Sequence, residues 1–100
     1  MKSDDPLGTQ SRRLRAVRKL YADKGGKAAT ERFAAEMDFS YNRWNNFENG
    51  YEFPRAAAFA FHDKYPDISI DWIWWGITRG MTESLLQQLR AAAEKEDNQK

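Results

Sequence analysis

The sequence predicts a small all-α domain, and three observations support this class. Apolar residues recur at three- and four-residue spacing in successive segments, as they do on the buried face of a helix. Most of these segments follow a serine or threonine suited to cap a helix N-terminus, and glycine or proline stands near several of their ends. One hundred residues, 41% of them hydrophobic and 14% aromatic, suffice for one globular core but not for two.

The N-terminal part begins without a periodic apolar pattern, so we expect a flexible lead-in over residues 1–10. Ser11 then caps a first helix that runs to about Asp23, and Lys24-Gly25-Gly26 ends it. The inward stripe of this helix holds Leu14, Val17, Leu20 and Tyr21, and its solvent-facing cations are Arg12, Arg13, Arg15 and Lys19.

Two short helices separated by a tight turn are expected next. The first covers about residues 27–37, and Asp38 follows where the chain must turn, because a short polar residue tolerates a left-handed backbone. Ser40 caps the other, which ends near Asn49-Gly50, since glycine suits a left-handed C-cap. Its inward residues are Trp44 and Phe47, and its other faces carry Tyr41, Asn42, Arg43, Asn45 and Asn46.

An exposed helix this rich in amide and cationic groups differs from a merely solvated surface, which favours Glu and Lys. Asparagine can offer a paired donor and acceptor to a base edge, and arginine can grip guanine or phosphate. Ten cations and six anions lie between Arg12 and Arg55, so positive charge gathers on the segment that contains this helix. The alternative is an ordinary polar surface without a ligand.

The run F-A-x-x-M-x-F-S-x-x-x-W-x-x-F-E-N-G, from Phe33 to Gly50, resembles the helix-turn-helix of the Cro/C1-type (XRE) family of bacterial and phage repressors. The similarity spans roughly residues 12–76, and Asp38 stands where the family commonly has a glycine. It implies a five-helix lambda-repressor-like DNA-binding domain over residues 11–76, followed by an added C-terminal helix.

The resemblance also implies a role for individual residues. The positions similar to the family's base-reading sites and their neighbours are Tyr41, Asn42, Arg43, Asn45 and Asn46. The positions near its phosphate contacts are Thr30, which replaces a common glutamine, and Asn49 and Arg55. Arg18 and Glu48 correspond to a structural ion pair, in which a guanidinium satisfies a partly buried carboxylate.

Two further helices complete this domain. Proline pre-sets the first turn of a helix over about residues 54–65. Ser69 caps a short helix over residues 70–75, closed by Gly76, and its Ile-Asp-Trp sequence is similar to the end of the family's five-helix core. Three tryptophans within four positions cannot all face one small core. They mark either an interface or a helix folded back with one ring half exposed.

A last helix is expected after Thr82, to about Lys95, within a C-terminal segment of residues 77–100. Its apolar stripe can cover the tryptophan cluster within the monomer or dock on a second subunit, and we favour docking, as a dimerisation element. The candidate interface residues are Trp72, Trp74, Trp75, Leu85 and Leu89.

Other classes of protein find little support. With no cysteine and one histidine, His62, we expect no metal site, no cofactor and no disulfide. No nucleophile elbow or phosphate loop occurs, so an enzyme is not expected. No apolar run approaches a membrane span and MKSDDPLG lacks the apolar core of a secretory signal, so a cytoplasmic protein is expected.

These observations predict a transcriptional regulator, in the role of a repressor, that binds double-stranded DNA. A homodimer on an inverted-repeat operator is expected, because single recognition helices bind weakly. The alternative function is a protein-interaction module or antitoxin-type partner binder that uses the surface from Trp72 to Trp75.

Overall fold

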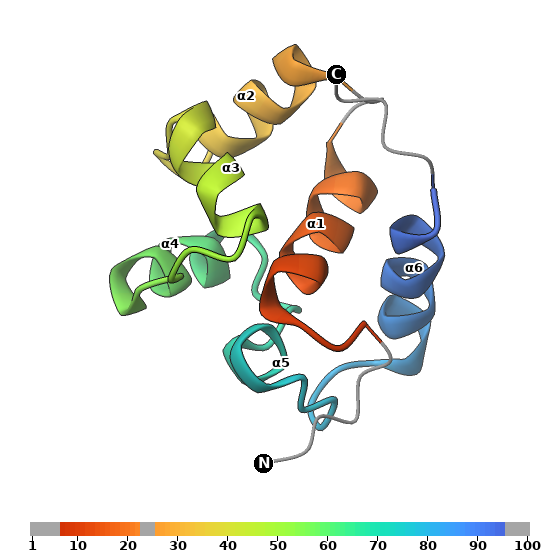
Figure 1. Ribbon diagram of the computed structural model, residues 1–100. Coiled ribbons are helices and arrows are strands. Elements are labelled where there is room, and N and C mark those ends of the chain that lie inside the picture. Colours follow the sequence, from red (N-terminus) through yellow and green to blue (C-terminus); the bar gives the residue numbers. More distant parts are fainter. Residues whose placement is uncertain (1–6, 23–25, 96–100) are drawn as a thin grey trace.

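Six α-helices make up the part of the chain that the computed structural model describes, residues 7–22 and 26–95 (Figure 1). They are α1 (Gln10–Tyr21), α2 (Lys27–Ala35), α3 (Tyr41–Glu48), α4 (Arg55–Lys64), α5 (Ile70–Trp75) and α6 (Glu83–Ala93). These residues include no β-strand, and none of their helices is long and apolar enough to cross a membrane. The predicted all-α class, five helices followed by an added C-terminal helix, is confirmed.

Side-chain caps begin three of the helices where the sequence predicts them. The hydroxyl oxygens of Ser40, Ser69 and Thr82 accept hydrogen bonds from the backbone N–H three residues later, at 3.0, 3.2 and 3.1 Å. Each bond satisfies an amide that has no acceptor within its helix. Pro54 precedes α4 as its N-cap residue rather than lying in its first turn, so this helix begins at Arg55.

The start of α1 differs from the prediction. Thr9, not Ser11, is the cap, because its hydroxyl accepts the backbone N–H three residues later at 3.3 Å. Leu7 is buried against the core just before it. The expected flexible lead-in over residues 1–10 is therefore wrong for residues 7–10, and its remaining part lies outside the described residues.

Helix ends deviate from the predicted ones by up to two residues, which is the usual uncertainty for fraying termini. Helix α2 ends at Ala35 rather than Met37, although the Met37 side chain stays in the core. Helix α6 ends at Ala93 rather than Lys95. The predicted end of the first helix at Asp23 lies outside the described residues.

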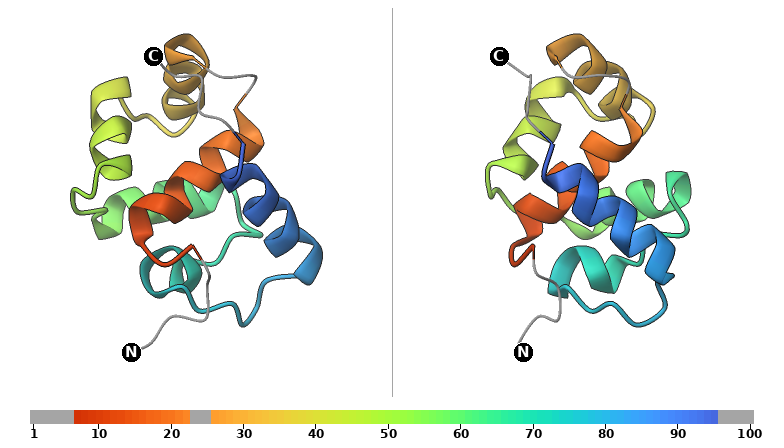
Figure 2. Two further views of the ribbon diagram at one scale, coloured as in Figure 1. Left: turned by 45° about the vertical axis from the view of Figure 1, so that its right-hand side comes forward. Right: turned by 90° about the vertical axis from the view of Figure 1, so that its right-hand side faces the viewer.

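Helix α1 is the centre of the domain. It contacts α2, α3, α5 and α6, and its contact with α6 is the most extensive. In the views of Figures 1 and 2, α6 lies along one side of α1, whereas α2, α3 and α4 lie on the other. The fully buried residues Leu14, Ala16 and Val17 supply the apolar surface of α1. The remaining helices are thus arranged around one inner helix.

Aromatic rings fill the space between α2, α3 and α4. The Trp44 ring is fully buried, with its centroid 5.0 Å from that of Phe33, 6.1 Å from Phe47 and 6.3 Å from Phe61. Phe53, in the segment between α3 and α4, lies edge-to-face on Phe47 with the centroids 4.9 Å apart. Such large rings bury much apolar area in a few residues, so they hold the inner side of α3 firmly in place.

The apolar stripe of α6 is used within the monomer. Leu86, Leu89 and Ala92 are buried, and α1 provides the main contact surface of this helix. The expectation that this stripe docks on a second subunit is therefore wrong, because α1 already covers it. Burying the stripe against α1 also closes the side of the core opposite α3.

The expected solvent exposure of Arg13 is wrong. The sequence places it among the solvent-facing cations, yet it is buried, and its Nε donates a hydrogen bond to the Ile73 carbonyl oxygen at 3.0 Å. The last carbonyls of a helix have no N–H partner within it, and α5 is only six residues long. Arg13 therefore ties α1 to the end of α5.

Tyr21, predicted to face inward, is 41% exposed and stacks on Tyr65 with the ring centroids 4.6 Å apart. Tyr65 also stacks on Phe33 at 5.9 Å. Burial, followed by the nearby Glu36 carboxylate and Tyr21, raises the pKa of Tyr65 to about 12. The neutral phenol of Tyr65 is thus favoured in the folded protein.

We expect Leu89→Ala to lower the free energy of unfolding by about 2–5 kcal/mol, because it removes a fully buried side chain and leaves a cavity. Gln87→Ala, on the exposed side of the same helix, is the control and should change stability little. Denaturant unfolding followed by circular dichroism measures both. A loss that depends on protein concentration would show instead that α6 packs on another subunit.

We also expect alkaline pH to weaken the fold through Tyr65. Its folded-state pKa is raised above the unfolded value, so its contribution is fully present below about pH 10 and is lost as the pH rises toward about 12. Tyr65→Phe should flatten this part of the stability profile, whereas Tyr51→Phe, at an exposed position, should not. Urea unfolding midpoints across this pH range test the difference, and parallel profiles for the two variants would contradict it.

Candidate nucleic-acid interface

A tight turn between α2 and α3 sets the angle at which α3 leaves the core. Asp38 is the one non-glycine residue with positive φ among the described residues, at +63°, as predicted for this position. The backbone N–H of Asp38 donates to the Ala35 carbonyl, and that of Phe39 donates to the Ala34 carbonyl, both at 3.0 Å. Asp is among the few side chains that adopt this conformation readily, so glycine is not needed here.

Helix α3 has one inner and one outer side. Trp44, Phe47 and Glu48 are buried, which agrees with the predicted inward orientation of the two aromatic residues. At 3.6 residues per turn, the residues opposite this buried side are four asparagines. Asn42, Asn46 and Asn49 are exposed and Asn45 is half-buried. The outer side of α3 is therefore lined by side-chain amides and carries no charge.

The four amides differ in what they contact. Asn49, predicted to contact phosphate, turns back on the helix, and its Nδ2 donates to the Asn45 carbonyl oxygen at 2.9 Å. The side chains of Asn42 and Asn46 form no hydrogen bond with any other residue that the structure describes. These two amides lie one helical turn apart and are available to a ligand.

Cationic groups lie on both flanks of this amide surface. Arg43 is exposed, and its guanidinium carbon lies over the rings of Phe39 and Phe47, 5.1 and 5.7 Å from their centroids. On the other flank, the Nζ of Lys27, at the start of α2, lies 5.1 Å from the centroid of the Tyr41 ring. Cation–π contacts hold both cations in defined positions.

Arg55 and Thr30, both predicted to contact phosphate, differ in accessibility. Arg55 is the exposed first residue of α4. Thr30 is 1% exposed, and its hydroxyl donates to the Gly26 carbonyl oxygen at 3.2 Å. The assignment of Thr30 is wrong, because its side chain is buried and its hydroxyl is already bonded within the first turn of α2. Lys27 is the exposed cation at this end of α2. It was included in the predicted positive charge of this segment but not among the predicted site residues.

A buried carboxylate anchors the inner end of α3. Glu48 is 6% exposed, and Arg18 of α1 donates to it twice, from Nε to Oε2 at 2.6 Å and from Nη2 to Oε1 at 2.9 Å. The indole N–H of Trp44 also donates to Oε2. The predicted Arg18–Glu48 ion pair is thereby confirmed, and its bidentate geometry joins α1 to α3.

Arg15 completes this anchor, although the sequence placed it in solvent. Its Nε donates to Glu48 Oε1 at 3.4 Å, and its Nη2 donates to the Glu48 backbone carbonyl at 3.3 Å. The side chain of Arg15 remains 42% exposed. Arg15 lies three residues before Arg18, and residues at this spacing share one face of a helix. This spacing is the signal that could have identified Arg15 as a second partner of Glu48.

The predicted interface residues are not all at the surface. Trp72 and Leu89 are fully buried core residues, so neither can contact a partner, and Leu85 is half-buried. Trp74 is half-buried and its indole N–H donates to the Phe53 carbonyl oxygen at 3.2 Å. Trp75 is 57% exposed. Of the tryptophan cluster, only its last member offers a large accessible ring.

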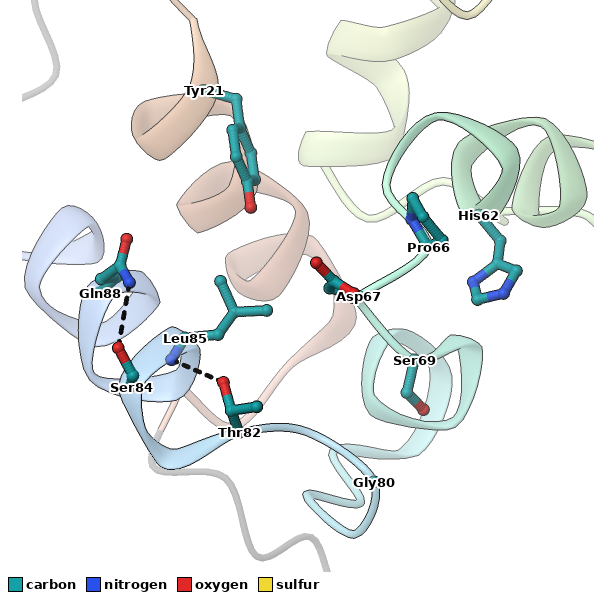
Figure 3. Close-up of a pocket in the computed structure, with 10 residues that line it drawn as sticks. All are labelled: Tyr21, His62, Pro66, Asp67, Ser69, Gly80, Thr82, Ser84, Leu85 and Gln88. Carbon is teal, nitrogen blue, oxygen red and sulfur yellow. Dashed lines mark hydrogen bonds between the residues drawn. The ribbon is translucent and has the colours of Figure 1, made fainter.

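Trp75 lines a shallow groove of about 440 Å³ together with Trp74 and residues of the segment after α3. A larger open groove, of about 630 Å³, lies between α1, the α4–α5 segment and α6 (Figure 3). Its polar groups are partly engaged already, because Thr82 caps α6 and Ser84 accepts a hydrogen bond from Gln88 at 3.4 Å. Burial and the Asp67 carboxylate raise the pKa of Tyr21 at its edge.

Within the described residues, no three His, Cys, Asp or Glu side chains lie close enough to hold a metal ion. No protein-family model, curated protein or solved structure matches this chain. The amide surface of α3 and its flanking cations join two unpaired amides to positive charge on one exposed face.

We expect Glu48→Gln to lower the free energy of unfolding by about 3–5 kcal/mol, because it leaves a buried guanidinium without its carboxylate. Glu36→Gln is the matched control. It breaks an ion pair between Glu36 and Lys64 whose partners are both well exposed, and should cost less than about 1 kcal/mol. Denaturant unfolding compares the two, and equal losses would show that the buried pair does not anchor α3.

Proposed function

We propose that this protein binds double-stranded DNA sequence-specifically through α3 in the major groove, and acts as a transcriptional regulator of the Cro/C1-type (XRE) class, in the role of a repressor. The observation that carries the proposal is the outer side of α3, where unpaired amides are presented on a helix whose inner side is anchored by Glu48. The F-E-N-G run and the five-helix core add the sequence resemblance to this geometry.

The shape of the surface suits a groove. The major groove of B-DNA is about 12 Å wide and admits an α-helix. Helix α3 lies at the periphery of the domain, where its outer side is not covered by another helix (Figures 1 and 2). The side chains of Asn42 and Asn46 are short and uncharged, so they allow the helix backbone to approach base edges closely.

The cations favour contact with the two phosphate backbones. Arg43 and Lys27 flank α3, and Arg55 is the exposed first residue of α4, so all three are available to phosphates on the walls of the groove. Glu52, exposed in the segment after α3, offsets part of this positive charge. We therefore propose a modest electrostatic contribution, with base contacts supplying much of the selectivity.

A homodimer on an inverted repeat is part of the proposal, because one short helix reads too few base pairs for tight binding. The buried face of α6 is not the dimer contact in this arrangement. The rival function is a protein-interaction module that uses the exposed Trp75 ring and the groove beside it.

Selection from a pool of random duplexes tests the proposal, and an enriched inverted repeat is the expected outcome. Three cations per half-site and two half-sites predict that log K falls with log salt with a slope of roughly −5. Binding that persists or strengthens as salt rises would favour the Trp75-centred protein contact instead.

We expect the double variant Asn42→Ala/Asn46→Ala to lose preference for the selected duplex over an unrelated one, while it keeps its helicity and the salt slope. The control is Gln87→Ala/Gln88→Ala, which removes two exposed amides from α6 and should bind as the parent protein does. Fluorescence anisotropy with both duplexes measures the ratio of affinities. Unchanged selectivity in the first variant would contradict the assignment of these two asparagines.

A further inference from the structure

We infer that the DNA half-site of this protein is read through adenine, by Asn42 and Asn46, and that no side chain of α3 reads guanine. This inference rests on the proposed function and concerns the base that the same surface recognises. It follows from the amide composition of the outer side of α3, from the position of Arg43 and from the spacing of the two unpaired amides.

The outer side of α3 matches the chemistry of one base edge. A side-chain amide presents one donor and one acceptor at its end, and adenine presents the complementary pair, N6–H₂ and N7, in the major groove. Guanine presents two acceptors, O6 and N7, which call for the two donors of an arginine or for a lysine. The outer residues of α3 include asparagines but no cation. This surface therefore matches adenine and not guanine.

Arg43 is the single cation within α3. It lies four residues after Phe39 and four before Phe47, and its guanidinium is stacked over both rings. Because the two rings belong to the core, this stacking favours a guanidinium position along the flank of α3, away from the centre of its outer side. From the flank, Arg43 reaches the phosphates of the groove wall rather than the base edges.

The spacing of the two unpaired amides fits neighbouring bases. Asn42 and Asn46 lie four residues apart on one face, which is about 6 Å along the helix axis at 1.5 Å per residue. Bases along a strand rise by about 3.4 Å, so the two amides reach positions separated by one or two base steps. Asn49 is already engaged with the Asn45 carbonyl, and Asn45 is half-buried, so these two do not extend the reading surface.

The absence of long side chains on this face is part of the inference. Asparagine has a single methylene between its backbone and its amide, so it reaches a base edge only where the helix lies deep in the groove. No arginine, lysine, glutamine or glutamate stands on the outer side of the described helix to hold it away from the base edges. The surface is thus suited to close approach over two adenines.

The experiment uses the full chain and its selected duplex, with single purines replaced by their 7-deaza forms. Replacing N7 by C–H removes one acceptor from the base edge and leaves Watson–Crick pairing intact. We expect 7-deazaadenine at two positions per half-site, one or two steps apart, to weaken binding roughly tenfold each. Substitution of 7-deazaguanine at the positions that face α3 should change affinity less than about twofold, because no guanine N7 contact is lost there.

The variants assign the two adenines to residues. In Asn42→Ala, one of the two sensitive positions should become insensitive to 7-deazaadenine, and in Asn46→Ala the other should, as expected for directly coupled partners. Arg43→Ala should weaken binding to all duplexes alike and reduce the salt slope by about one per half-site, without changing the order of preferred sequences.

Two outcomes would overturn the inference in distinguishable ways. Selective binding that is sensitive to 7-deazaguanine, and that Arg43→Ala relaxes at that position, would show that Arg43 reads guanine, and DNA binding itself would stand. Failure of the folded protein to bind any duplex at low salt would refute the proposed function and the inference together.

Discussion

The buried carboxylate of Glu48 is the interaction on which the rest of this structure depends. It lies at the C-terminal end of α3 and accepts hydrogen bonds from Arg18 and Arg15 of α1 and from the indole of Trp44. A buried charge is tolerated only where such partners surround it. Because α1 also contacts α2, α5 and α6, this one carboxylate links α3 to the whole domain.

This anchor separates the two sides of a very short helix. The inner side of α3 is held by ring packing around Trp44 and by the Glu48 network, so little freedom remains for the helix to tilt or rotate. The outer side contributes almost nothing to the core. The residues at positions 42 and 46 therefore affect binding to a ligand without affecting the packing of the fold. A reading surface on a rigid element loses less entropy on binding than one on a loop.

Much of the candidate site could be predicted from the sequence, because helical spacing places Asn42 and Asn46 opposite Trp44 whatever the neighbouring helices do. The Arg18–Glu48 pair came from the resemblance and holds in the structure. What the sequence did not show were contacts between side chains. Thr30 was assigned a phosphate contact although its side chain is buried and its hydroxyl donates to the Gly26 carbonyl oxygen. Arg43 is exposed as expected, but sequence spacing does not show that its guanidinium stacks on core rings.

The sequence by itself determined the number of helices, three of the four side-chain N-caps and the left-handed turn at Asp38, because these depend on residues a few positions apart. Only the tertiary structure decided what each apolar stripe and each long cation contacts. It placed the stripe of α6 on α1 rather than on a second subunit, and it buried Arg13 against the end of α5. The physical reason is that a stripe or a guanidinium specifies the kind of surface it needs, whereas the packing of distant helices decides which surface is within reach.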